Sequence, residues 1–142
     1  MTYLLDVNVL IALIDPTHVS HDAAHQWFAA TGSDSWATCP ITENAVLRIV
    51  GHPRYANTPG SPAIVAGVLA RLREQPGHVF WSDDISLLDP VLVDIDRLLS
   101  HKQVTDSYLL ALAIAHAGQL ATLDRRLSVA AVRGGQAGLS VI

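Results

Sequence analysis

The chain has 142 residues, half of them apolar and 15% charged, and its formal net charge is −4 with histidines neutral. These values are typical of one globular domain, here residues 1–142, and they exclude a disordered chain; the single cysteine, Cys39, excludes an internal disulfide. Apolar stretches end well short of a membrane span and no secretion signal is visible, so we expect a cytoplasmic protein without a membrane. The acidic balance means that any surface for nucleic acid must be local.

The first half of the chain alternates short apolar strands with amphipathic helices. Ser20 is a good N-cap, Pro40 stops a strand, and Gly51 and Pro76 mark helix ends. The predicted elements are a strand over 2–5, helices over 8–14 and 20–30, a strand over 35–40, and helices over 41–51 and 62–75.

The second half continues the alternation. Thr105 or Asp106 begins an alanine-rich helix that Gly118 closes, and Pro90 interrupts or restarts an earlier helical segment. The predicted elements are a strand over 78–83, helical structure over 84–100, a helix over 107–118, a strand over 119–124, a short helix over 125–133 and a strand over 138–142. Strands that alternate with helices in this way predict an α/β fold with a mainly parallel sheet covered on both faces.

Four carboxylates fall at equivalent places in this pattern. Asp6 ends the first strand and Asp124 ends the fourth, while Glu43 lies in the first turn after the second strand and Asp106 begins the alanine-rich helix. Strand ends and helix starts of this kind face one edge of a parallel sheet, which is where such folds bind ligands. Taken singly, Asp106 is better explained as a helix cap and Glu43 as a residue that complements the helix dipole; taken together, the four acids predict a site.

Carboxylates held close together repel one another, and a divalent cation removes that conflict. An all-oxygen set without cysteine suits Mg²⁺ or Mn²⁺ rather than zinc. Three histidines, His18, His21 and His25, have helical spacing, but we interpret them as an exposed helix face and not as a zinc site. The expected chemistry is hydrolysis of a phosphodiester bond by metal-activated water.

Four segments of the chain resemble the PIN-domain nucleases, and within them the VapC-type toxins of bacterial toxin–antitoxin pairs. The segments are LLDVNVLIAL, ITENAVLRIV, VTDSYLLALAIAHAGQLATLD and the final GLSVI, in the family's order and spacing. The resemblance implies a three-layer α/β/α fold with a central parallel sheet. It also implies an Mg²⁺- or Mn²⁺-dependent endoribonuclease that is inhibited by a small cognate antitoxin protein.

The resemblance also assigns roles to residues. The family's four acids fall on Asp6, Glu43, Asp106 and Asp124, and its two supporting polar groups fall on Asn8 and Thr122. We expect Asp6 and Asp106 to be metal ligands. Glu43 and Asp124 are either ligands through water or groups that orient the nucleophile. Cleavage of RNA would leave 5′-phosphate and 3′-hydroxyl ends.

Two other functions fit parts of the pattern. A phosphatase with an aspartate nucleophile also uses a strand-end acid such as Asp6, but it needs a second aspartate where this chain has Asn8. A catalytically inactive PIN-like module would bind RNA or protein without cleavage. The apolar surplus of the helices over 20–31 and 61–75 predicts a homodimer. Candidate RNA contacts are Arg48, His52, Arg54, Lys102, Arg125, Arg126 and Arg133.

Overall fold

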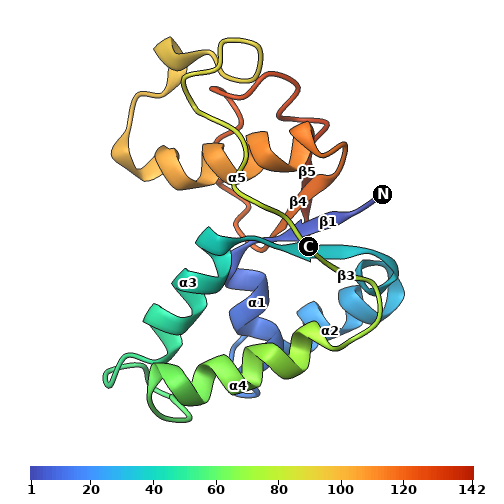
Figure 1. The fold of residues 1–142 in the computed structure, drawn as a ribbon, viewed down its shortest axis with the longest axis vertical. Helices are drawn as coiled ribbons and strands as arrows, with labels where there is room; N and C mark the ends of the chain where they lie inside the picture. Colours follow the sequence, from blue (N-terminus) through green and yellow to red (C-terminus); the bar gives the residue numbers. More distant parts are fainter.

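The computed structural model describes residues 1–142 and is built around a five-stranded parallel sheet in the order β3-β2-β1-β4-β5 (Figure 1). The strands are β1 (Tyr3–Leu5), β2 (Trp36–Thr38), β3 (His78–Phe80), β4 (Gln119–Thr122) and β5 (Leu139–Val141). The strand predicted over 78–83 is thus shorter than expected. The chain runs outward from β1 through β2 to β3 and then returns through the segment that contains α5 to β4, which pairs with the other side of β1. The first strand therefore lies at the centre of the sheet.

Helices cover both faces of the sheet, which confirms the expected α/β/α architecture (Figure 1). One face carries α1 (Val7–Ile14), α2 (His21–Ala30), α3 (Pro40–Val50) and α4 (Pro62–Arg73), and the other carries α5 (Val104–Ala115). The longest of them, α4 and α5, have 12 residues each, and none is long and apolar enough to cross a bilayer.

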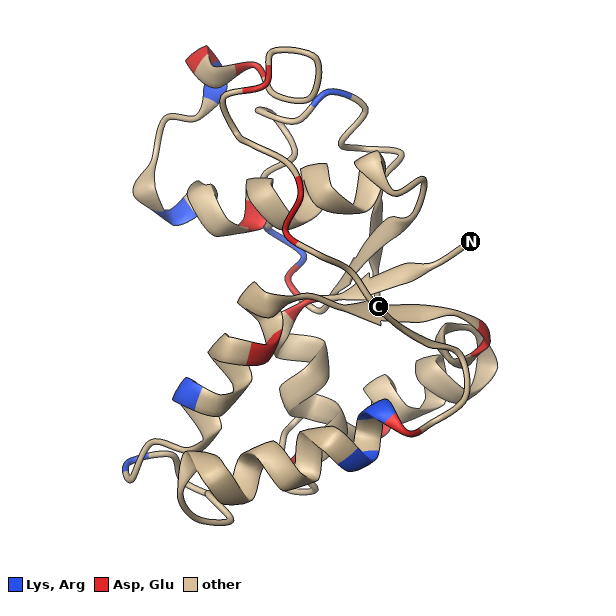
Figure 2. Ribbon diagram, viewed as in Figure 1, with Lys and Arg blue, Asp and Glu red and all other residues tan.

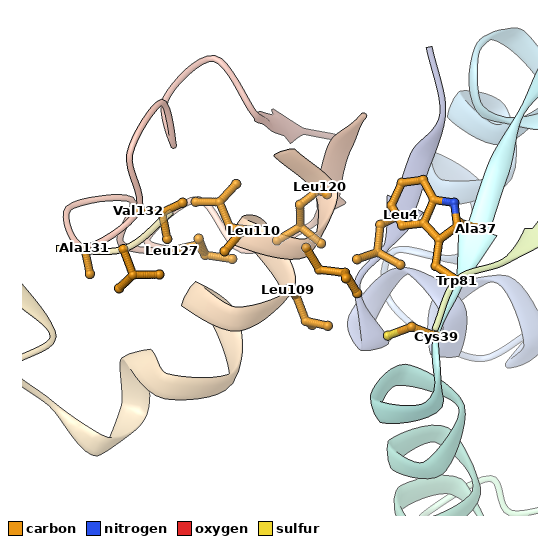
Figure 3. Packing of buried hydrophobic residues seen from close by; sticks show 14 residues of the cluster. Leu4, Ala37, Cys39, Trp81, Leu109, Leu110, Leu120, Leu127, Ala131 and Val132 are labelled. Atoms are coloured by element: carbon orange, nitrogen blue, oxygen red, sulfur yellow. The ribbon is translucent and has the colours of Figure 1, made fainter. Parts of the chain in front are cut away.

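The alternation of side chains along each strand divides the core in two. Leu4 points toward α5 and packs with Ala37 and Leu120, while the adjacent Leu5 points toward α1–α4 and packs with Trp36. Figure 3 shows the first of these clusters, in which α5 leucines meet the sheet. Cys39 is fully buried in the same cluster, in agreement with a packing role. The sheet is therefore packed with apolar side chains on both of its faces.

Two helices predicted from the sequence are not formed. The segment over 84–100 consists of turns and one short 3₁₀ helix (Ile95–Arg97), and the segment over 125–133 consists of turns. The two segments pair with each other instead, through an antiparallel bridge between Val93 and Val132 and a 2.8 Å bond from the Asp94 N–H to the Ala131 carbonyl. A second bond joins the Arg133 N–H to the Leu92 carbonyl at 2.9 Å, so the backbone around Val93 and Val132 is extended and paired instead of helical.

The loop after α3 is fastened to the far end of α1. Asp15, the C-cap of α1, is 6% exposed and accepts hydrogen bonds from the Tyr55 hydroxyl, from Asn57 Nδ2 at 2.7 Å and from the backbone and hydroxyl of Thr17 at 2.9 Å. Burial alone would raise the pKa of Asp15, but these donors together hold it below its usual value. Asp15 is therefore a buried acid with a full set of partners.

The histidines of the α2 region also contact the end of α1. A ring nitrogen of His21 lies 2.7 Å from the Ala12 carbonyl and one of His25 lies 2.8 Å from the Leu13 carbonyl. The Ser20 side chain, predicted as the N-cap of α2, makes no capping bond. The interpretation of this histidine face as merely exposed was incomplete, because two of its rings cap the last carbonyls of α1.

Candidate active site

Asp6 stands where β1 ends and α1 begins, and it is the N-cap of that helix. Its Oδ1 accepts the Val7 N–H at 2.7 Å, and its Oδ2 accepts the Thr122 hydroxyl at 2.7 Å and Asn8 Nδ2 at 3.3 Å. The residue is 5% exposed, so the carboxylate is held in a fixed position by the ends of two neighbouring strands.

Hydrogen bonds of Asn8 and Thr122 join these two strand ends. Asn8 Nδ2 lies 3.2 Å from Thr122 Oγ1, and Asn8 Oδ1 accepts the Leu123 N–H at 3.1 Å. Thr122 Oγ1 also accepts the Asp124 N–H at 3.1 Å. The exposed Asp124 is thereby tied through its backbone to the same hydroxyl that contacts Asp6.

The third aspartate comes from the opposite face of the sheet. Asp106 lies in the first turn of α5 and is half-buried. Burial, followed by the negative charges of Asp6 and Asp124, raises its pKa to about 6. Burial also raises the pKa of Asp6, with a contribution from the Asp124 charge, although Thr122 and the Val7 N–H oppose it. Asp6, Asp106 and Asp124 therefore lie close enough for their charges to interact. They stand at the carboxyl ends of β1 and β4 and in the first turn of α5, where acidic segments gather (Figure 2).

Glu43, the fourth predicted acid, contacts Thr38 and Arg73. It lies in the first turn of α3, its side chain is 17% exposed, and its Oε2 accepts the Thr38 hydroxyl at 2.6 Å. Arg73 Nη1, from the end of α4, lies 3.1 Å from Oε2 and 3.3 Å from Oε1. Glu43 is therefore ion-paired with Arg73, whereas the three aspartates influence one another through their charges.

Arg73 and its neighbours were not predicted from the sequence. The Arg73 guanidinium lies 5.3 Å from the centre of the Phe80 ring, and Thr38 Oγ1 lies 2.8 Å from His78 Nε2. The one hydroxyl proton of Thr38 goes to Glu43, so His78 Nε2 donates to Thr38 in turn. Arg73 is 30 residues from Glu43 in sequence, and no local pattern links the two.

The candidate metal ligands of the three aspartates are carboxylate oxygens, which suit a hard divalent cation. No three His, Cys, Asp or Glu side chains are arranged to share one ion. Mg²⁺ usually binds through one or two carboxylates and keeps several waters, so this set of residues fits such an ion. A cation would also relieve the repulsion that raises the pKa of Asp106.

The basic residues proposed for RNA contact differ in their surroundings. Arg125 and Arg126 are exposed directly after Asp124, whose Oδ1 accepts the Arg126 N–H at 2.8 Å. Arg133 contacts the protein itself, since its Nε donates to the Pro90 carbonyl at 2.8 Å. His116, at the end of α5, stacks on Trp81 and lies 3.0 Å from Asp84 rather than contacting the last carbonyls of its helix.

Known proteins resemble the chain over most of its length. The model of the PIN domain matches residues 3–133. Ribonuclease VapC44 of Mycobacterium tuberculosis is 46% identical over 134 residues, which cover 94% of each chain, and ribonuclease VapC39 of the same organism is 44% identical over 94% of this chain and 96% of its own. Among solved structures, VapBC2 from Rickettsia felis, bound to a DNA fragment from its promoter, shares the fold with a TM-score of 0.53 at 14% identity, over 87% of this chain and 89% of that one.

Proposed function

The chain belongs to the PIN-domain family, among relatives of the VapC ribonucleases, and we propose that it is the endoribonuclease toxin of a toxin–antitoxin pair. The observation that carries the proposal is the convergence of Asp6, Asp106 and Asp124 on one edge of the sheet. A phosphatase with Asp6 as nucleophile is disfavoured, because the second acid it needs is replaced by Asn8, which donates to Asp6 and Thr122.

In the proposed reaction Asp6 and Asp106 would hold Mg²⁺ or Mn²⁺. When bound, such a cation acidifies water and offsets the charge of the scissile phosphate. Asn8 and Thr122 fix the orientation of the Asp6 carboxylate. Asp124 and Glu43 orient the attacking water or bind the ion through water. Arg125 and Arg126 extend from the same strand end toward the RNA backbone, which supplies a local positive surface on an acidic protein.

The proposal is tested by the substitution Asp106→Asn, with Asp96→Asn as a control at an exposed acid of the 3₁₀ helix. Purified proteins are incubated with cellular RNA and Mn²⁺, and cleavage is followed with the chemistry of the new ends. We expect D106N to lower the rate at least about 100-fold, since even supporting groups at metal sites are worth about 10–100-fold.

The expected products of the wild-type protein carry 5′-phosphate and 3′-hydroxyl ends, and D96N should produce them at the wild-type rate. Cleavage that needs no divalent cation, or that persists unchanged in D106N, would contradict the proposed site. A catalytically inactive module would show neither cleavage nor stabilisation by Mn²⁺ in thermal unfolding.

We also propose two protein partners. A small antitoxin would cover the acidic site, and a second copy of the chain would cover apolar surface that includes Ile64 on α4, which is 52% exposed. RNA as substrate and the reduced Cys39 are both compatible with the cytoplasm. Sedimentation equilibrium of the purified toxin at micromolar concentration tests the homodimer; a monomer throughout would contradict it.

A further inference from the structure

Glu43 has a charged partner, Arg73, that its expected role does not explain. It lies on the helix that follows β2, the strand beside β1, so its backbone is placed next to the strand end that carries Asp6. Its carboxylate nevertheless accepts bonds from Thr38 and Arg73, and both of its oxygens are within 3.3 Å of Arg73 Nη1. A carboxylate neutralised in this way is a poor ligand for a cation.

Residues of β3 contact both Arg73 and Thr38, which are the two partners of Glu43. Phe80 on the edge strand β3 lies beneath the guanidinium, and the Thr38 hydroxyl that contacts Glu43 is held by His78 of the same strand. The Arg73 side chain is 40% exposed, so it can leave Glu43 for solvent without any change in the packed core. The Arg73 side chain can therefore separate from Glu43 by a change of rotamer alone.

We infer that Arg73 is a positioning residue that competes with the divalent cation for Glu43. This inference rests on the proposed function. In the metal-free protein Arg73 holds Glu43 out of the aspartate cluster. When a cation occupies Asp6 and Asp106, Glu43 leaves Arg73 and turns toward the cluster by a change of side-chain rotamer, which completes the acidic set predicted from the sequence.

Competition of this kind has a reciprocal signature. If the Arg73–Glu43 contact weakens metal binding, then bound metal must weaken the Arg73–Glu43 contact by the same factor. A merely structural ion pair would be unaffected by metal. The distinction can be measured by binding and by unfolding, without any measurement of RNA cleavage.

The experiment titrates Mn²⁺ calorimetrically into wild type, Arg73→Gln, Glu43→Gln and the double variant. Arg71→Gln is the matched control, since Arg71 has the same charge on the same helix and the structure gives it no carboxylate partner. We expect R73Q to bind Mn²⁺ about two- to fivefold more tightly, the factor that corresponds to a modest ion pair. R71Q should match wild type, and R73Q should have no effect when Glu43 is already replaced.

Denaturant unfolding of the same four proteins completes the test. The double-mutant cycle should show coupling between Arg73 and Glu43 without metal, and less coupling at saturating Mn²⁺. If wild type binds Mn²⁺ but R73Q matches R71Q, or if the coupling is the same with and without Mn²⁺, the inference is wrong while the proposed nuclease stands. If neither wild type nor R73Q binds Mn²⁺, the proposed metal site fails and the inference fails with it.

Discussion

Helix α1 begins at one buried aspartate and ends at another, and the two have opposite properties. Asp6 at the N-cap and Asp15 at the C-cap are 5% and 6% exposed. The pKa of Asp6 is raised, chiefly by burial and further by the charge of Asp124, whereas the pKa of Asp15 is lowered because its hydrogen bonds outweigh burial. Burial alone therefore does not tell a functional acid from a structural one.

The difference lies in the groups that surround each carboxylate. Asp15 is surrounded by neutral donors, Tyr55, Asn57 and Thr17, which stabilise its charge within the protein. Asp6 has donors as well, but burial and the charge of Asp124 raise its pKa, and its own charge raises the pKa of Asp106. A charge that the folded protein supports imperfectly is one that a bound cation can stabilise.

The largest expected effect separates the two residues by activity. Asp6→Asn should reduce RNA cleavage at least about 100-fold, because it removes a proposed metal ligand. Asp15→Asn should retain most of the wild-type rate, assayed at a temperature at which both variants are folded by circular dichroism. Comparable loss of cleavage in the two variants would contradict the distinction.

The second effect is on stability, and here the substitution of Asp15 should matter more than that of Asp6. Asp15→Asn should lower the free energy of unfolding by about 2–3 kcal/mol, since it replaces charge-assisted hydrogen bonds in a buried site. Asp6→Asn should leave the free energy of unfolding unchanged or raise it, because the folded state disfavours the charge that is removed. Urea unfolding of the metal-free proteins measures both; a less stable D6N would show that Asp6 is also structural.

A smaller effect concerns the support of Asp6. Thr122→Val keeps the shape of the side chain and removes the hydroxyl that donates to Asp6 and accepts from the Asp124 N–H. We expect cleavage to fall about 10-fold through loss of orientation of Asp6. Thr58→Val, which removes a hydroxyl from the loop fastened near Asp15, should be without effect on the rate.

The smallest effect is a pair of opposite pH slopes in stability. The pKa of Asp106 is raised to about 6, so the folded protein takes up a proton before the unfolded chain, and the free energy of unfolding rises as pH falls from about 6 to about 4. The lowered pKa of Asp15 gives a contribution that is complete above about pH 4 and is lost below it. Urea titrations across this range should lose the first slope in Asp106→Asn and the second in Asp15→Asn.

Local pattern predicted the regular part of the fold and failed where distant segments pair. The helices on the α1–α4 face were found because each has an apolar stripe or a clear stop, such as Gly51 after α3. The helix predicted over 84–100 does not form, because Asp89 accepts the Val91 N–H through its side chain and the Leu92 carbonyl accepts from Arg133. The turn at Asp89 is local in sequence, but the pairing of Leu92 with Arg133 has no local signature.

The site shows the same limit. Asp6, Asp106 and Asp124 could be placed together because strand ends and helix starts meet at one edge of a parallel sheet. The orientation of Glu43 could not be predicted, since it depends on Arg73 at the end of a helix that follows a long loop. The backbone position of a site residue follows from topology, but the direction of its side chain follows from partners that are remote in sequence.

The hydrogen bond between Thr122 and Asp6 spans 116 residues, and β1 is bordered by β2 on one side and by β4 on the other. During synthesis, the side of β1 that faces β4 can be paired only after β4 has been made, near the end of the chain. A polypeptide released early, before β4, has neither Thr122 nor Asp124 and cannot assemble the acidic edge. The groups that surround Asp6 are therefore complete only when nearly the whole chain has been made.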